Sequence, residues 1–430
     1  MKSKLLSFAR FVFYAMMIIS SSIIANAQKA KKNIADFKDD NLIETLMKKK
    51  PRYFDSIIQN KDSLRLQVIY TQINRDKNNK PSFKNYYFNV SDTHYFYPAS
   101  TVKMPISFLA LQKLNELNIG GLDKNSSIIA DSNYSGQTKT LNDPTTPDGR
   151  PTVAQYIKKI FLVSDNEAFN RLYEFLGQEY INTQLAKMGY ADAQIRHRLQ
   201  VSLSADENSH TNPISFYDTS GKLLYNQPMQ FSQQKFSERN DFVGKGYYQG
   251  NKLINHPMDF SQKNRMCLED FHNILKSVIF PESFDLNQRF NLKDDDYKFL
   301  YQYMSQYPGE TNYPSYDTAE TWNGIGKFLY WGAEKGDLPK NIRIFNKIGG
   351  AYGFLIDVSY FVDFDKKIEF MLSAAIYCNK DGILNDDKYD YNDVGYPFMK
   401  QLGRMIYEYE LKRKKIFKPN LSKFKMQYDK

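Results

Sequence analysis

The chain has 430 residues, of which 42% are hydrophobic, 15% aromatic and 25% charged, and its formal net charge is +10. This composition is typical of a globular protein with one large domain or two, and excludes a low-complexity chain. Two cysteines and five scattered histidines lack the spacing of a metal site, so we expect no metal. No nucleic-acid motif accompanies the positive charge, which suits contact with anionic envelope surfaces instead.

The first 27 residues are typical of a secretory signal peptide. Lys2, Lys4 and Arg10 flank an apolar run from Phe11 to Ile24, and Ala25-Asn26-Ala27 forms a small-x-small cleavage site. An uncleaved membrane anchor is the alternative, but the run is short and contains small polar residues. Cleavage leaves a chain near +7, because the signal carries three of the basic charges and no acids. We therefore expect a periplasmic or secreted protein without a membrane span.

The predicted elements before residue 121 are two helices with a strand hairpin between them. In chain order they are a polar leader (28–40), a helix interrupted near Pro51 (41–60), two strands of a hairpin (64–70 and 86–90), and an apolar helix after Ser100 that two glycines close (to 121). The next region is mostly helical. It comprises a long loop (123–151), helices at 153–161, 167–177, 264–280 and 292–306, and insertions near 205–258 and 308–340.

After residue 340 the apolar period changes to two. Strands are predicted at 342–347, 354–362 and 368–377, followed by a helix at 397–412. The first and last strands can pair into one antiparallel sheet, which predicts an α+β fold with three α/β/α layers. We expect a catalytic domain (41–415), with a sheet subdomain (41–100 and 340–415), a helical subdomain (101–339) and a basic tail (416–430).

Ser100 and Lys103 lie three residues apart where an extended segment becomes a helix. Positions i and i+3 share one face of a helix, so a neutral amine can take the hydroxyl proton as the oxygen attacks a carbonyl. The pattern alone is weak, because it recurs at Ser232/Lys235 and Ser422/Lys425. Motifs elsewhere in the chain must decide whether it marks an active site.

Two such motifs follow in order, Ser164-Asp165-Asn166 and Lys347-Ile348-Gly349. Together with Ser100-x-x-Lys103 they resemble the serine β-lactamase and penicillin-binding-protein superfamily, most closely class A β-lactamases, over about residues 41–412. A simpler explanation of Ser164 is a capping box with Glu167, which needs no catalysis. Ser-Asp-Asn occurs once, whereas Lys-x-Gly recurs away from any predicted strand.

The resemblance implies a role for each motif residue. Ser100 would be the nucleophile, Lys103 the base or relay, and Ser164 the donor to the leaving nitrogen. The implied substrate-binding residues are Asn166, Lys347, Gly349 and Gly350, with the N–H groups of Ser100 and Gly350 forming the oxyanion hole. The resemblance implies a monomer that needs no cofactor and acts on a β-lactam or a cell-wall peptide.

Two departures from the family pattern affect the expected substrate and rate. Ile348 replaces a threonine or serine whose hydroxyl bonds the substrate carboxylate. The acid that activates the deacylating water in the family has no clear counterpart here. Glu207, with Asn212 as its partner, is the best candidate. The alternative is that Glu207 is an ordinary acidic residue of a loop. Without that base, the acyl-enzyme would persist as in a penicillin-binding protein.

The sequence thus predicts an exported serine hydrolase of the class A β-lactamase type that acts on cyclic amides, with antibiotic resistance as its role. One alternative is a D,D-peptidase that acts on cell-wall peptides. Another is a non-catalytic envelope-binding protein, for which Ser100→Ala would leave the biological phenotype intact. Export permits a disulfide between Cys267 and Cys378, and two buried thiols are equally compatible with the sequence.

Overall fold

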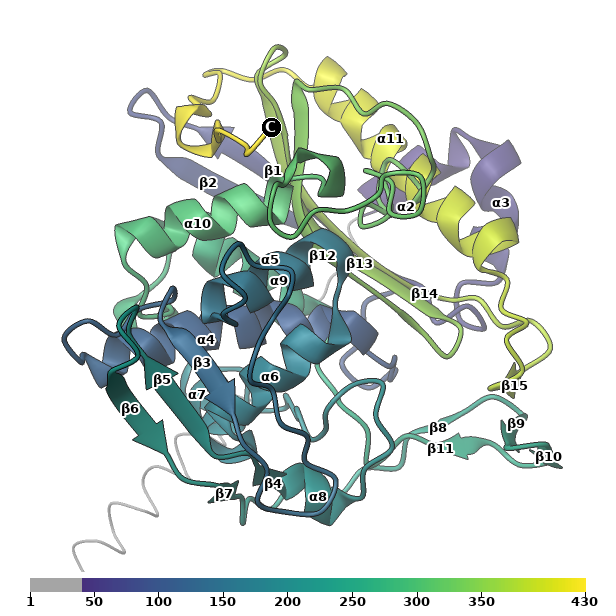
Figure 1. Ribbon diagram of the computed structural model, residues 1–430. Coiled ribbons are helices and arrows are strands. Elements are labelled where there is room, and N and C mark those ends of the chain that lie inside the picture. Colours follow the sequence, from purple (N-terminus) through teal and green to yellow (C-terminus); the bar gives the residue numbers. More distant parts are fainter. Residues whose placement is uncertain (1–40) are drawn as a thin grey trace, which may run out of the picture. The chain divides into compact units, whose positions relative to one another are not determined.

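A five-stranded antiparallel sheet, in the order β12-β13-β14-β1-β2, forms the central layer of the fold (Figure 1). Its strands are Gln67–Arg75 (β1), Pro81–Phe88 (β2), Ile342–Ala351 (β12), Phe354–Asp363 (β13) and Ile368–Tyr377 (β14). β1 pairs with β14, so segments about 300 residues apart in sequence meet in one sheet. The computed structural model describes residues 41–430, and the predicted signal peptide and polar leader lie outside this range.

Side chains of the sheet alternate between two apolar cores. In β1, Val68 and Tyr70 belong to one core, whereas Ile69 and Ile73 belong to the other. The first core is covered by α2 (Leu42–Lys48), α3 (Pro51–Gln59) and α11 (Tyr396–Lys412), and the second by α9 (Leu268–Ile279). The predicted α+β fold with α/β/α layers is therefore confirmed.

The helical part of the fold is built around α4, which is buried at every position from Lys103 to Leu114. A helix that is buried on all sides must lie at the centre of other helices. The helices of this part are α4 (Lys103–Leu117), α5 (Val153–Val163), α6 (Asn166–Leu176), α7 (Gln178–Lys187), α8 (Ala205–Ser209) and α10 (Asp294–Ser305). α4 contacts α5, α6 and α7, and α10 contacts both α5 and β12.

Short strands occupy regions that the sequence predicts mainly as loops. They are β3 (Ser127–Ala130), β4 (His210–Thr211), β5 (Ile214–Tyr217), β6 (Leu223–Gln227), β7 (Gln230–Phe231), β8 (Phe242–Val243), β9 (Gly246–Gln249), β10 (Lys252–Ile254), β11 (Met258–Asp259) and β15 (Ile383–Leu384). Several pair over long sequence distances, as β3 does with β5. Such partners leave no local signal in either segment.

The chain after α11 packs back onto the domain. Leu421 and Phe424 are buried, and Phe424 contacts the rings of Tyr301, Phe345 and Tyr360. Cys267 and Cys378 are both free thiols in this structure. Within residues 41–430, we find no helix that combines the length and the apolar character needed to span a bilayer.

Candidate active site

Ser100 lies on a 3₁₀ turn (η2, Ala99–Val102) that leads directly into α4. The turn begins with Ala99 in the left-handed region, at φ +46°, a conformation that a non-glycine residue adopts only when its surroundings hold it there. Thr101 and Val102 are fully buried and fix the turn, while Ser100 is partly exposed. The sequence therefore folds into a rigid support that keeps one hydroxyl accessible.

The Ser-Asp-Asn motif lies at the corner between α5 and α6. Asp165, not Ser164, caps α6, because its carboxylate accepts a hydrogen bond from Ala168 N at 2.7 Å. Ser164 ends α5 in the left-handed conformation, with φ +60°. The capping-box explanation of Ser164 is therefore wrong, and its hydroxyl is available for other partners.

Two lysine amines converge on that hydroxyl. Nζ of Lys347 donates to Ser164 Oγ at 2.8 Å, and Nζ of Lys103 donates to the same oxygen at 3.3 Å. Lys103 also donates to Oδ1 of Asn166 at 2.7 Å and to the carbonyl oxygen of Ser164. Side chains from all three motifs thus meet in one hydrogen-bonded cluster, which we call the lysine-serine cluster (Lys103, Ser164, Asn166 and Lys347).

Gly349 brings β12 against the turn that carries Ser100. A Cβ atom at this position would lie 2.7 Å from the carbonyl oxygen of Pro98 and 3.2 Å from the backbone nitrogen of Ser100. Any side chain would force the strand away from the nucleophile. Gly350 is the next residue on β12 after this close contact. This position is compatible with the predicted oxyanion hole, which uses the N–H groups of Ser100 and Gly350.

Burial changes the protonation of both lysines. Desolvation lowers the pKa of Lys103 to about 7, although the nearby Asp165 carboxylate opposes the shift. Desolvation also lowers the pKa of Lys347 well below its usual range, and repulsion from Lys103 adds to that effect. A lysine can accept the proton of Ser100 near pH 7 only when its amine is neutral, and the lowered pKa of Lys103 provides that form.

The structure does not bring Glu207 to the lysine-serine cluster. Its carboxylate closes a capping box on α8, accepting from Ser204 N at 2.8 Å and Ser204 Oγ at 2.9 Å, and it also accepts from Ser135 Oγ at 2.8 Å. These donors hold the pKa of Glu207 below its usual value. Its expected partner Asn212 donates to the carbonyl oxygens of Asp131 and Thr138 instead.

Gln200, seven residues before Glu207 in the sequence, contacts the lysine-serine cluster through Asn166. Its Oε1 accepts a hydrogen bond from Asn166 Nδ2 at 2.5 Å. Ile325, from the predicted insertion at 308–340, is also close: it lines a cavity of about 40 Å³ with Ser164, Lys347 and Ile348. Neither residue belongs to a motif, so the sequence offered no signal for either contact.

Arg198 anchors the segment that carries Gln200. Its buried guanidinium donates to Glu174 Oε1 at 2.8 Å and to the carbonyl oxygen of His210 at 3.0 Å. Arg198→Met would leave the buried Glu174 carboxylate with Arg171 as its remaining cationic partner. We expect a loss of about 3 kcal/mol in the free energy of unfolding, measured by urea denaturation.

The matched control for this prediction is Lys139→Met. Lys139 pairs with Asp131 on the surface, where both side chains are 58% exposed, so its urea midpoint should stay at the wild-type value. A midpoint for Arg198→Met that equals the control would show that this anchor does not stabilise the domain.

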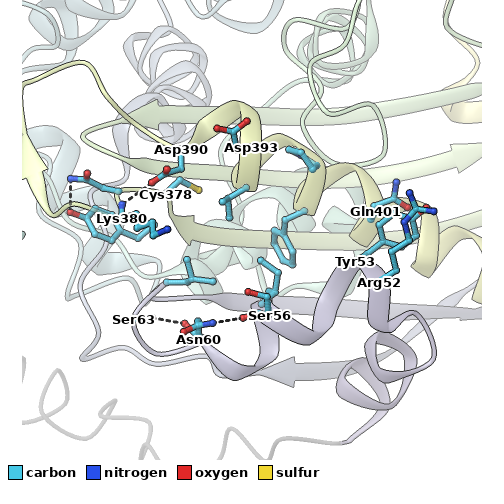
Figure 2. A pocket seen from close by; sticks show the side chains of 17 residues that line it. Arg52, Tyr53, Ser56, Asn60, Ser63, Cys378, Lys380, Asp390, Asp393 and Gln401 are labelled. Carbon is cyan, nitrogen blue, oxygen red and sulfur yellow. Dashed lines mark hydrogen bonds between the residues drawn. The ribbon is translucent and has the colours of Figure 1, made fainter.

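A second cavity, of about 570 Å³, lies between α3, α11 and the end of β14, and Figure 2 shows its lining. Arg52 and Tyr53 on α3 lie at one end, and Lys380 and Asp390 lie at the other. No residue of the lysine-serine cluster lines this cavity. Within residues 41–430, no three His, Cys, Asp or Glu side chains gather as they would around a metal ion.

Comparison with known proteins finds one family model that matches part of the chain. Residues 52–234, which include Ser100, Lys103 and the Ser-Asp-Asn motif, match a model described as the β-lactamase enzyme family. The chain has the fold of a β-lactamase-like serine hydrolase. No curated protein sequence matches it.

Solved structures of β-lactamases are similar to this β-lactamase-like chain over most of its length. A β-lactamase from Xanthomonas campestris is 11% identical, with a TM-score of 0.45, and the match covers 86% of this chain and 99% of that one. The β-lactamase of Streptomyces albus G is 12% identical, with a TM-score of 0.46, covering 82% and 97%. A structure titled PBP-A is 14% identical, with a TM-score of 0.44, covering 86% and 96%.

Proposed function

We propose that the protein is an exported class A-type serine hydrolase that is acylated at Ser100 by a β-lactam or a related amide. The observation that supports this most is the shared hydroxyl of Ser164, which accepts from Lys103 and Lys347 beside the nucleophile's turn. A capping or packing role for Ser164 would not require two buried amines. The N-terminal sequence pattern of basic, apolar and small residues supports export.

The proposed reaction uses the cluster residues together with Ser100 on the adjacent turn. Neutral Lys103 takes the proton of Ser100 as Oγ forms a bond to the amide carbon, and the backbone N–H groups of Ser100 and Gly350 hold the developing oxyanion. The C–N bond then breaks. The proton passes from Lys103 through Ser164 to the leaving nitrogen, which leaves an ester on Ser100 and returns Lys103 to its neutral form.

Rapid hydrolysis of that ester would make the protein a β-lactamase, whereas slow release would make it a penicillin-binding protein of the D,D-peptidase type. The contacts of Lys103 and Asn166 favour the second outcome. Among residues 41–430, the hydrogen-bond partners of their side chains are Ser164 and Gln200 besides each other, and neither partner is a carboxylate. Asp165 lies nearby, but its carboxylate caps α6.

A labelled-penicillin time course tests this function, because it reports acylation and release together. We expect one label per chain and a half-life of the adduct that is long compared with its formation. Turnover of a chromogenic cephalosporin without an accumulating adduct would indicate a β-lactamase instead. Release of terminal D-alanine from a muropeptide would identify the peptidase, and no adduct with any β-lactam would contradict the proposal.

Ile348 gives a prediction about substrate recognition. It lines the small cavity beside Ser164 and Lys347, where it offers no hydrogen bond to a substrate carboxylate. Ile348→Thr adds a hydroxyl there, and one hydrogen bond to a charged group stabilises by about 1.5 kcal/mol. We expect the second-order rate constant for acylation by benzylpenicillin to rise about tenfold.

Ile348→Val is the matched control, because valine has the shape of threonine without its hydroxyl. We expect this variant to keep the wild-type rate constant. Equal increases in both variants would show that space in the cavity, rather than carboxylate recognition, limits acylation.

A further inference from the structure

Tyr352 lies at the end of β12 that packs against the nucleophile's turn. A Cβ atom on Gly349 would lie 3.2 Å from Ser100 N, and Tyr352 follows three residues later, at most about 10 Å further along the chain. Tyr352 and Gly353 have φ angles of +54° and +82°, which are typical of a two-residue hairpin turn. The Tyr352 ring also packs against the ring of Tyr97, with centres 5.2 Å apart. The turn and this ring contact place Tyr352 beside the segment that carries Ser100.

The amine of Lys263 lies over this tyrosine ring, 5.9 Å from the ring centre. Among residues 41–430, the amine has neither a hydrogen-bond acceptor nor a carboxylate partner. Lys263 is half-buried, and burial lowers the pKa of its amine with no nearby carboxylate to oppose the shift. An ammonium group that has lost part of its water and has no anionic partner attracts an anion.

The backbone of Lys263 is held in place by Arg239. Nη2 of Arg239 donates to the carbonyl oxygen of Phe260 at 2.9 Å and to that of Lys263 at 2.6 Å. The ring of Phe260 in turn packs against the Tyr352 ring, with centres 5.2 Å apart. Because both ends of the segment 260–263 are fixed, the Lys263 amine has a defined position beside Tyr352.

Positive charge predominates around Lys263. Desolvation lowers the pKa of the buried His197 to about 4, and repulsion from Lys263, Arg196 and Arg239 adds to that shift. The nearby carboxylate of Asp241 lies 3.4 Å from Arg239, so an arginine already balances its charge. A ligand that reaches Lys263 from the side of Tyr352 therefore meets a positive potential.

We propose that Lys263 and Tyr352 form a subsite for acyl donors whose side chain carries a carboxylate. The inference rests on the proposed acylation of Ser100 and names the substrate class of that site. The ammonium group of Lys263 attracts the carboxylate. The Tyr352 ring packs against the carbon atoms that join this carboxylate to the reacting amide. Lys263 is therefore a specificity-determining residue and takes no part in proton transfer.

Three penicillins that share a phenyl side chain test the proposal. Carbenicillin has an added carboxylate on this side chain, ampicillin has an ammonium group there, and benzylpenicillin has neither. Competition with fluorescent penicillin gives the acylation rate constant of each compound, and the ring carboxylate common to all three cancels in their ratios. We expect Lys263→Met to lower the ratio of carbenicillin to benzylpenicillin about tenfold, as for one lost hydrogen bond to a charged group. Lys263→Glu should lower this ratio further and raise the ratio of ampicillin to benzylpenicillin.

Two control variants complete the test. Lys263→Arg keeps the positive charge and should keep the wild-type ratios, and so should Lys139→Met, which removes a surface lysine that pairs with Asp131. Unchanged ratios in folded Lys263→Met and Lys263→Glu, even with every rate constant lower, would overturn the subsite while Ser100 still forms its adduct. Failure of the wild type to form an adduct with any penicillin would instead overturn the proposed function.

Discussion

Replacing Ser100 by alanine is expected to abolish covalent labelling by fluorescent penicillin. The variant lacks the oxygen that forms the ester, so the loss should be of the order of 10⁶-fold, as for other enzymes that lose their nucleophile. The partly exposed Ser100 side chain is small, and its turn is fixed by Thr101 and Val102. The melting temperature should therefore stay close to that of the wild type.

Ser422→Ala is the control, because Ser422 also precedes a lysine by three residues. It is exposed on the 3₁₀ turn Ser422–Phe424, away from the three motifs in sequence, and should keep full labelling. Labelling of the folded Ser100→Ala protein would show that another group carries the acyl adduct.

Replacing Lys103 by methionine is expected to slow the acylation of Ser100 by about 10²- to 10⁴-fold. Methionine keeps the length and apolar stem of the fully buried lysine, but it cannot accept the proton of Ser100. It also removes the hydrogen bonds to Asn166 Oδ1 and Ser164 Oγ, which breaks the path to the leaving nitrogen. Stopped-flow measurement with fluorescent penicillin gives the rate constant.

Lys113→Met separates loss of chemistry from loss of stability. Lys113 is a second buried lysine on α4, and burial lowers its pKa to about 8. Its amine bonds the carbonyl oxygens of Phe175 and Leu176 and the side chain of Gln227, and none of these belongs to the lysine-serine cluster. The control should lose stability without losing the acylation rate; a comparable rate loss in both variants would contradict the role of Lys103.

The sequence predicts the three motifs and the elements that carry them, because each motif has a local signature. Ser100 opens an apolar helix, Ser164 separates two helices, and Lys347 lies on a strand with period two. The α+β fold follows from the same patterns. Most of the sheet can be predicted because apolar residues recur with period two along these strands, and the structure buries every position of β13 and β14.

The contacts of the segment 196–212 could not be predicted, because they depend on distant anchors. Whether Gln200 or Glu207 reaches Asn166 is decided by Arg198 bonding Glu174 and by Asn170 bonding Leu199. None of these pairs has a periodic pattern or a fixed spacing. The Glu207 prediction relied on counting residues, whereas the observed contact depends on how this loop folds back on α6.

The pH dependence of Ser100 acylation tests most directly whether a neutral lysine drives the reaction. Burial lowers the pKa of Lys103 to about 7, with Asp165 opposing the shift, so Lys103 is protonated and inactive as a base below that pH. The acylation rate constant should therefore be low at pH 5, rise through a single inflection near pH 7, and stay level above pH 8. A rate constant that is independent of pH between 5 and 9, or that rises only near pH 10 where an ordinary lysine titrates, would contradict the account.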